Sequence, residues 1–234
     1  MPAKPALVLV PGLLCDRYVW EPQIAALSAD HDITVPDLMG HDSITGMAQH
    51  VLSAAPQTFA LAGHSMGARV ALEMMRMAPE RIERLALLDT GIHPQQPGER
   101  EKRMALVNVA QTQGMGALAD LWLPPMVYAD GPRAAELMAE LRAMVLRREP
   151  RNFADQVAAL LGRPDAAEGL AAINCPVLIG VGRHDTWSPP AQHEAIAALI
   201  PQARYVVFED SGHMSTVETP DAVSAALADW LRSA

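Results

Sequence analysis

The sequence predicts an α/β fold with a mostly parallel central sheet of about six strands, flanking helices and an inserted helical cap. Short apolar runs recur along the chain, amphipathic stretches separate most of them, and one long interval has helical periodicity but no strand pattern. With 234 residues, 50% of them hydrophobic, the chain can bury one substantial core. We therefore expect one domain with an insertion, and we exclude a repeat array or a fibre.

The expected strands are six runs rich in leucine or β-branched residues. Each run is almost continuously apolar, which is typical of a parallel strand buried on both faces. They span Ala6–Val10, Asp32–Val35, Thr58–Ala62, Leu85–Asp89, Val177–Val181 and Arg204–Phe208. Because parallel neighbours need a crossover connection, helices are expected between these runs.

Helical periodicity fills most of the intervals between the expected strands. The expected helices are Glu21–Ser28, Ile44–Ala54, Met66–Met77, Ala191–Leu199 and Asp221–Leu231. Pro79 marks the end of the third helix, because proline cannot continue the hydrogen-bond ladder. The pattern is that of a parallel sheet with crossover helices.

The interval 93–163 breaks this alternation. It contains helical segments such as Glu99–Gln113 and Arg133–Arg147, separated by glycine and proline turns. The interval is too long for a simple crossover. We therefore expect residues 93–163 to form a helical cap over the carboxyl edge of the sheet, with residues 1–92 and 164–234 as the α/β core.

Charge and composition restrict the possible partners. The formal net charge is −9, so nucleic acid and an anionic membrane surface are not expected as main partners. The expected cap has nine Lys and Arg residues among a similar number of acids, so the net negative charge lies on the core. These basic residues could recognise an acidic acyl tail or a carrier protein, but a solvated helical face is the favoured interpretation.

No secretory leader precedes the first apolar run, and no apolar run is long enough to span a bilayer. Cys15 and Cys175 form neither a disulfide framework nor a metal-binding pattern, and we expect buried free thiols. The sequence therefore predicts a cytoplasmic protein without a metal site. Whether it is a monomer or a homodimer is left open.

A candidate nucleophile lies in segment 63–67, which reads Gly-His-Ser-Met-Gly between the expected strand Thr58–Ala62 and the helix Met66–Met77. A sharp strand-to-helix turn presents the hydroxyl of Ser65 at the edge of the sheet, where a base and a substrate can reach it. The turn requires residues without side chains two positions before and after the serine. The segment therefore predicts a nucleophilic Ser65.

The base and acid of such a nucleophile are expected later in the chain. His213 follows the last expected strand in a glycine-containing loop, and we identify it as the base. Asp185 follows the strand Val177–Val181 and would hold the His213 tautomer. Asp89 ends another strand and is the rival acid, although a role in the loop entering the cap is preferred. We give His64 a supporting role at most.

Backbone amides complete the predicted site. The amide of Met66 at the start of its helix and that of Leu13 after the first expected strand would hold an oxyanion. Four other histidines lack such a setting and are expected in solvent: His31, His41, His50 and His193.

These motifs together resemble the α/β-hydrolase superfamily across essentially the whole chain. The residues that match are Pro11, Gly12, segment 63–67, Leu87–Asp89, segment 182–185 and segment 211–213. The chain is most similar to the capped carboxylesterase branch, which also includes C–C bond hydrolases, lactonases and proline iminopeptidases. The resemblance implies a Ser-Asp-His triad, no cofactor and a helical cap that shapes the acyl pocket.

Two features depart from the superfamily pattern. The superfamily usually has His-Gly before the oxyanion residue, where this chain has Pro11 and Gly12. The first expected strand resembles the third strand of the superfamily, so two edge strands would be missing.

The leading hypothesis is a carboxylesterase that cleaves short to medium acyl esters of small molecules. A C–C bond hydrolase or a lactonase with the same triad is the alternative, an acyltransferase or perhydrolase stays open, and a ligand-binding member is the non-enzyme alternative. Leu14, Trp122, Met126, Trp187 and Met214 are the candidate pocket residues, although ordinary packing would explain them equally well. We expect activity to fall in acid as His213 protonates near its ordinary pKa of about 6.5.

Overall fold

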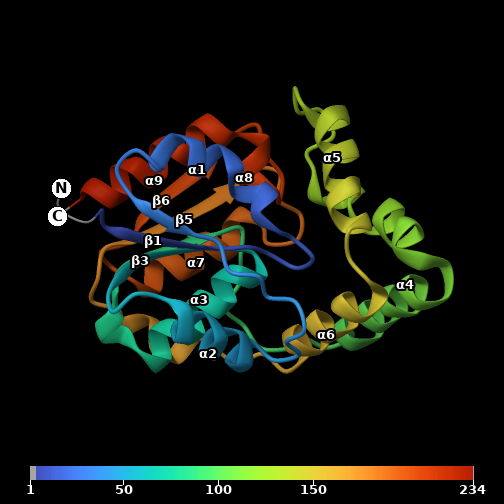
Figure 1. Ribbon diagram of the computed structural model, residues 1–234, viewed down its shortest axis with the longest axis horizontal. Helices are drawn as coiled ribbons and strands as arrows, with labels where there is room; N and C mark the ends of the chain where they lie inside the picture. The colour runs from blue at the N-terminus through green and yellow to red at the C-terminus, as the bar shows by residue number, and fades with distance from the viewer. Residues whose placement is uncertain (1–3, 234) are drawn as a thin grey trace.

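A six-stranded parallel sheet runs through the molecule (Figure 1), in the computed structural model that describes residues 4–233. The strand order is β2-β1-β3-β4-β5-β6, and every neighbouring pair is parallel. The strands are β1 (Ala6–Val10), β2 (Asp32–Thr34), β3 (Phe59–His64), β4 (Ile82–Leu88), β5 (Val177–Gly182) and β6 (Arg204–Phe208). The predicted fold class is confirmed, and each expected run forms a strand within three residues of its predicted ends.

The edge strands differ from the expectation that every strand is buried on both faces. The inner strands β1, β3 and β5 are almost wholly buried, whereas β2 alternates between exposed and intermediate residues and β6 is buried only at Phe208. An edge strand has a neighbour on one side only, so its local apolar pattern overestimates its burial. The sequence alone does not distinguish edge from centre.

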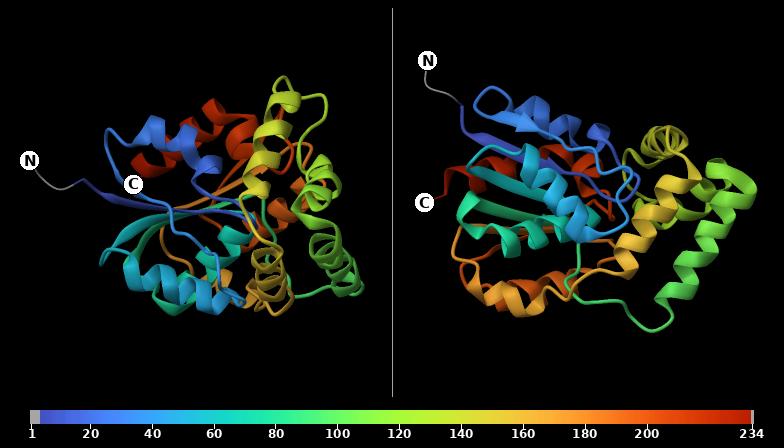
Figure 2. Two further views of the ribbon diagram at one scale, coloured as in Figure 1. Left: turned by 45° about the vertical axis from the view of Figure 1, so that its right-hand side comes forward. Right: turned by 60° about the horizontal axis from the view of Figure 1, so that its bottom comes forward.

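Helices cover both faces of the sheet (Figures 1 and 2). On one face lie α1 (Glu21–Leu27), α8 (Ser215–Glu218) and α9 (Pro220–Arg232), and on the other lie α2 (Ile44–Ala54), α3 (Met66–Met77) and α7 (Pro190–Leu199). The five predicted helices are present with ends shifted by at most one residue. The short helix α8 was not predicted, because one turn is too short to show helical periodicity.

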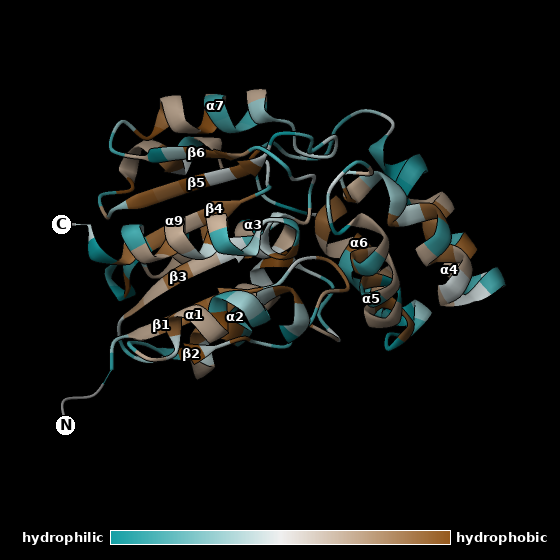
Figure 3. Ribbon diagram, turned by 90° about the horizontal axis from the view of Figure 1, so that it is seen from above, coloured by the Kyte–Doolittle hydropathy of each residue, from teal (hydrophilic) through white to brown (hydrophobic). Residues whose placement is uncertain are grey.

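Three further helices follow β4 and precede β5. They are α4 (Glu99–Trp122), α5 (Ala134–Leu146) and α6 (Pro150–Leu161), and they lie beyond one end of the sheet (Figure 3). The helix α4 extends nine residues past the predicted end at Gln113, with a kink at Gly114. The amide of His213 donates to the carbonyl of Met126, so this helical segment contacts the loop that follows β6.

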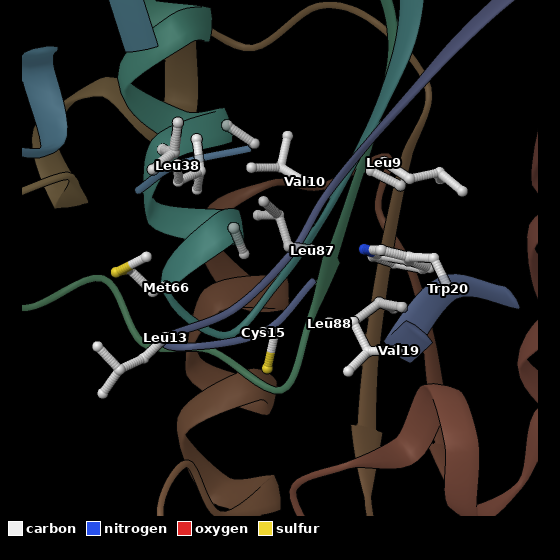
Figure 4. Close-up of a cluster of buried hydrophobic side chains, with 14 of the residues drawn as sticks. Leu9, Val10, Leu13, Cys15, Val19, Trp20, Leu38, Met66, Leu87 and Leu88 are labelled. Atoms are coloured by element: carbon white, nitrogen blue, oxygen red, sulfur yellow. The ribbon is translucent and has the colours of Figure 1, made fainter. Parts of the chain in front are cut away.

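One continuous apolar core connects the sheet with the helices on both faces and with α4–α6. Figure 4 shows part of it: Leu9 and Trp20 lie on one side of the central strands, and Val10 and Met66 lie on the other. Successive residues of a strand point to opposite faces, so both faces of β1 are packed. Within residues 4–233, none of the helices is long and apolar enough to cross a membrane.

The kink in α4 generates a stability prediction. Gly114 has φ 87° and ψ 172°, a backbone conformation that is essentially restricted to glycine. We expect Gly114→Ala to lower the free energy of unfolding by about 1–3 kcal/mol in urea titrations. The cause would be backbone strain and not crowding, because a Cβ atom added there would have no neighbour within 4 Å.

Gly169→Ala is the matched control. A Cβ atom at Gly169 would also meet open space, but the φ angle of Gly169 is not positive. Its free energy of unfolding should stay near the wild-type value. Equal destabilisation by both substitutions would contradict the strain argument.

Candidate active site

Ser65 lies at a sharp turn between β3 and α3. Its backbone has φ 54° and ψ −117°, which L residues rarely adopt, and its amide donates to the carbonyl of Leu88 at 2.8 Å. A Cβ atom at Gly63 would lie 2.4 Å from the carbonyl oxygen of Gly67, and one at Gly67 would lie 2.2 Å from that of Val10. Both positions therefore need glycine, as the sequence predicts for the residues two before and two after Ser65.

The structure brings Ser65, His213 and Asp185 into one hydrogen-bonded series. Nε2 of His213 lies 2.8 Å from Oγ of Ser65, and Nδ1 of His213 lies 2.8 Å from Oδ2 of Asp185. His213 and Asp185 are buried, whereas Ser65 is partly exposed. The three residues come from the loops after β6, β5 and β3, so the carboxyl edge of the sheet gathers them.

Asp185 is held as a carboxylate. Its Oδ1 accepts the backbone amides of Trp187 at 2.8 Å and Ser188 at 2.9 Å. Burial alone would raise the pKa of Asp185, but the charge and hydrogen bond of His213, together with these amides, lower it. The carboxylate is therefore available to stabilise an imidazolium on His213.

His213 responds in the opposite direction. Burial works against its charged form, but the charge and hydrogen bond of Asp185 outweigh burial and raise the pKa of His213 above its ordinary value. The sequence analysis used the ordinary histidine pKa of about 6.5, and this value is too low for the pKa of His213. A local sequence window does not show that Asp185 lies in contact with the imidazole.

Asp89 occupies a separate position in the same region. Its Oδ1 accepts the amide of Gly182 at 2.9 Å, its Oδ2 accepts the hydroxyl of Ser215, and its φ is 50°. Burial and the charge of Asp185 raise the pKa of Asp89 well above its usual range. Asp89 therefore joins β5 to α8 and does not partner Nδ1 of His213.

His64 supports the backbone of His213. Its Nε2 lies 2.7 Å from the carbonyl oxygen of His213, and burial together with the charge of His213 lowers the pKa of His64 to about 4. The neutral ring carries its proton on Nε2 and donates it to that carbonyl. His193, which the sequence placed in solvent, is also buried, and its Nε2 accepts the amide of Thr90 at 2.8 Å.

Leu13 follows β1 in the loop that contains Gly12, and Met66 directly follows Ser65 in the chain. A Cβ atom at Gly12 would be 3.3 Å from the Cβ of Ser65, so the loop after β1 passes close to the nucleophile. Both Leu13 and Met66 line the cavity at Ser65. Among residues 4–233, neither amide has a hydrogen-bond acceptor in the protein. Both are free to donate to a ligand oxygen.

A cavity of about 350 Å³ opens at Ser65. Four of the five residues predicted for the pocket line it, namely Trp122, Met126, Trp187 and Met214. Residues that the sequence did not single out complete the apolar wall: Leu106, Phe153 and Leu160, all from the helical segment. The cavity therefore lies between the sheet edge and α4–α6.

Leu14 does not line this cavity and is a correction to the predicted pocket. Its φ is 58°, its side chain is fully buried, and its amide donates to Oε1 of Gln156 at 2.7 Å. The left-handed backbone turns the side chain into the core, and Gln156 of α6 fixes that turn. A contact with a residue so distant along the chain has no local sequence signal.

Polar residues line another part of the same cavity. They are Arg69, His93, Gln96, Glu99, Lys102, Arg103, Arg163 and Gln192. The sequence reasoning missed Arg69, although one signal was available: Arg69 lies only four residues after Ser65, near the start of the helix that Ser65 caps. Within residues 4–233, no cluster of three His, Cys, Asp or Glu side chains could hold a metal ion.

Comparisons with known proteins agree with this architecture. An esterase from Thermogutta terrifontis, solved with malate bound, is 30% identical at a TM-score of 0.88, covering 98% of this chain and 90% of that chain. The enol-lactonase from Burkholderia xenovorans LB400 is 30% identical at a TM-score of 0.89, with coverages of 98% and 92%.

Comparison of sequences alone gives the same result. The pimeloyl-[acyl-carrier protein] methyl ester esterase of Nitrosomonas europaea is 26% identical over 93% of this chain and 92% of its own length. A sequence model described as the alpha/beta hydrolase family matches residues 7–226. With its parallel sheet, its turn at Ser65 and this match over nearly its whole length, the chain belongs to the alpha/beta hydrolase family.

Proposed function

We propose that the protein is a serine carboxylesterase that cleaves short to medium acyl esters through an acyl-enzyme on Ser65. The hydrogen-bonded series from Ser65 through His213 to Asp185, opening on a largely apolar cavity, is the observation that supports this function. Two of the three proteins compared above are named esterases.

The first half of the reaction forms the acyl-enzyme. Nε2 of His213 takes the hydroxyl proton of Ser65 while Oγ attacks the ester carbonyl, and Asp185 stabilises the imidazolium that results. The amides of Leu13 and Met66 donate to the oxyanion. His213 then gives the proton to the leaving alcohol oxygen, and the ester C–O bond breaks.

Water completes the cycle through the same groups. His213 takes a proton from water, the hydroxide attacks the acyl carbon, and Ser65 leaves with the proton that His213 returns. The products are the carboxylic acid and the free enzyme.

We further propose that segment 93–163 acts as the cap of the active site, since its residues Trp122, Met126 and Phe153 line the cavity.

A lactonase or a C–C bond hydrolase is the second candidate function. The named activity of the Burkholderia enol-lactonase, which is 30% identical, favours the lactone. An enol-lactone is an internal ester, so the same serine, base and oxyanion donors would serve it. Comparing kcat/KM for p-nitrophenyl esters, lactones and vinylogous diketones separates the three activities.

Loss of the nucleophile is the first functional test. Wild-type protein should hydrolyse short p-nitrophenyl esters and react with one equivalent of a fluorophosphonate, as measured by intact-protein mass spectrometry. Ser65→Ala should abolish labelling and lower kcat by about 10³-fold or more, because the acyl-enzyme cannot form. A folded wild-type protein that takes up no label would refute the proposal.

The pH profile is the second test. Because His213 must be neutral to act as base and its pKa is raised, kcat/KM should fall on the acid side with a midpoint above about 6.5. Stopped-time hydrolysis across pH 5 to 9, with stability checked by circular dichroism at each pH, gives the midpoint. A midpoint at or below the ordinary value would contradict the assigned role of Asp185.

Substitution of the two carboxyl residues is the third test. Asp185→Asn should lower kcat by about 10³- to 10⁴-fold and shift the acid midpoint downward, because His213 loses its charged partner. Asp89→Asn is the matched control: an asparagine oxygen can still accept the amide of Gly182. Its kcat should fall by less than about tenfold. The reverse order of effects would make Asp89 the acid.

A further inference from the structure

One part of the cavity wall holds more cations than anions. Arg69, Lys102, Arg103 and Arg163 line it, whereas Glu99 and Asp89 are the carboxyl residues in the wall. Both carboxyl oxygens of Asp89 are already occupied, because they accept the amide of Gly182 and the hydroxyl of Ser215. The cavity therefore has an excess of positive charge near a site of ester chemistry.

Glu99 is already engaged. Its Oε1 accepts from Nε of Arg103 at 2.7 Å and from Nη1 of Arg163 at 2.8 Å, and its Oε2 accepts from Nη2 of Arg163 at 2.7 Å. Arg163 also donates to the backbone carbonyls of His93, Pro94 and Leu160. These contacts give Glu99, Arg103 and Arg163 charged partners within the protein.

Arg69 has no such partner. Its Nη1 donates to the carbonyl oxygen of His93 at 3.0 Å, and within residues 4–233 it forms no ion pair and no other hydrogen bond. Burial and the charge of Arg163 both lower the pKa of Arg69, so the surroundings disfavour its cation. A guanidinium has five donors in a planar fork that matches a carboxylate.

A second buried group lies beside Arg69. Oε1 of Gln192 is buried without a hydrogen-bond partner, and Gln192 lines the cavity. A Cβ atom added at Gly91 would lie 3.0 Å from that Oε1 and 3.1 Å from Nη2 of Arg69, so both side chains converge on Gly91. Because the two ends of a glutamine amide are interchangeable by rotation, Gln192 can present its NH₂ group there.

The spacing to the nucleophile limits the length of a ligand. Ser65 caps α3, Arg69 follows four residues later within α3, and both residues line the cavity. Four residues advance about 6 Å along a helix. Nη2 of Arg69 lies beside Gly91, and the hydroxyl of the neighbouring Thr90 donates to the carbonyl of Ser65 at 3.0 Å. A ligand that joins the Ser65 hydroxyl to the Arg69 guanidinium therefore needs only a short chain between its two functional groups.

We propose that Arg69, with Gln192 beside it, forms a carboxylate subsite, so that the preferred substrate is a monoester of a short dicarboxylic acid. The free carboxylate binds Arg69 while the ester carbonyl lies at Ser65. This inference rests on the proposed function and adds its substrate class. The same cavity wall includes the apolar residues Leu106 and Trp122, which suit an aliphatic chain.

The kinetic test compares acidic and neutral esters of equal length. Mono-p-nitrophenyl esters of succinic, glutaric and adipic acid are measured beside analogues whose free carboxyl is a methyl ester. For one or more of the three chain lengths, wild type should have a higher kcat/KM for the ester with the free carboxyl group than for its neutral analogue. Arg69→Gln should lower the acid-to-neutral ratio by about ten- to hundredfold, because a charged hydrogen bond is lost.

Two further variants control this test. Arg69→Lys keeps the positive charge but loses the planar pair of guanidinium donors. Its acid-to-neutral ratio of kcat/KM should lie between those of wild type and Arg69→Gln. Arg142→Gln removes the same charge from an exposed pair with Asp120 outside the cavity and should keep the wild-type ratio. An unchanged ratio in Arg69→Gln, or an equal drop in Arg142→Gln, would overturn the subsite.

A binding test does not depend on turnover. Glutarate is titrated calorimetrically into Ser65→Ala and into Ser65→Ala with Arg69→Gln, each checked for folding by circular dichroism. The subsite is supported if the affinity of Ser65→Ala for glutarate falls tenfold or more when Arg69→Gln is added. It is overturned if Ser65→Ala does not bind glutarate. If the wild type hydrolyses neutral esters and the fluorophosphonate labels it only when Ser65 is present, the proposed esterase function stands even if the subsite fails. If the wild type takes up no label, the esterase function is refuted, but binding of glutarate at Arg69 is not.

Discussion

The turn at Ser65 is the constraint on which the rest of the site depends. Residues with positive φ cost about 1–3 kcal/mol, so the turn persists only because its surroundings leave no alternative. Gly63 and Gly67 allow α3 to approach the ends of β1 and β3 closely, and the amide of Ser65 is fixed by the carbonyl of Leu88. The hydroxyl is thus positioned by the packing of three adjacent strands and not by a flexible loop.

The remaining groups of the site reach Ser65 because the sheet is parallel. Every strand ends at the same edge, so the loops after β1, β4, β5 and β6 all meet there. The docking of the last two loops is tight: a Cβ atom at Gly182 would lie 1.9 Å from the carbonyl oxygen of Gly212. This contact holds the loops of Asp185 and His213 together, and Asp89 reinforces it through the amide of Gly182.

Sequence patterns predicted what is determined locally. The strands, the main helices and the turn at Ser65 follow from periodicity and glycine spacing. Position after a strand singled out Asp185 and His213, which the structure brings into one hydrogen-bonded series with Ser65. Burial and long-range contact were not predictable in the same way. His193 has polar neighbours in sequence yet is buried against Thr90, and Leu14 is turned into the core by Gln156. Arg69 was within reach of pattern reasoning, because it lies near the start of the helix that directly follows Ser65.

Charge is distributed unevenly within a protein that is acidic as a whole. Near Ser65 the carboxylate of Asp185 is matched by His213, and in segment 93–163 Glu99 is matched by Arg103 and Arg163. Arg69 faces the cavity and, among residues 4–233, forms no ion pair. A partly buried charge of this kind is favoured when a partner replaces the solvation that it has lost. In the proposed subsite, the free carboxylate of the substrate would supply that partner while the ester carbonyl lies at Ser65.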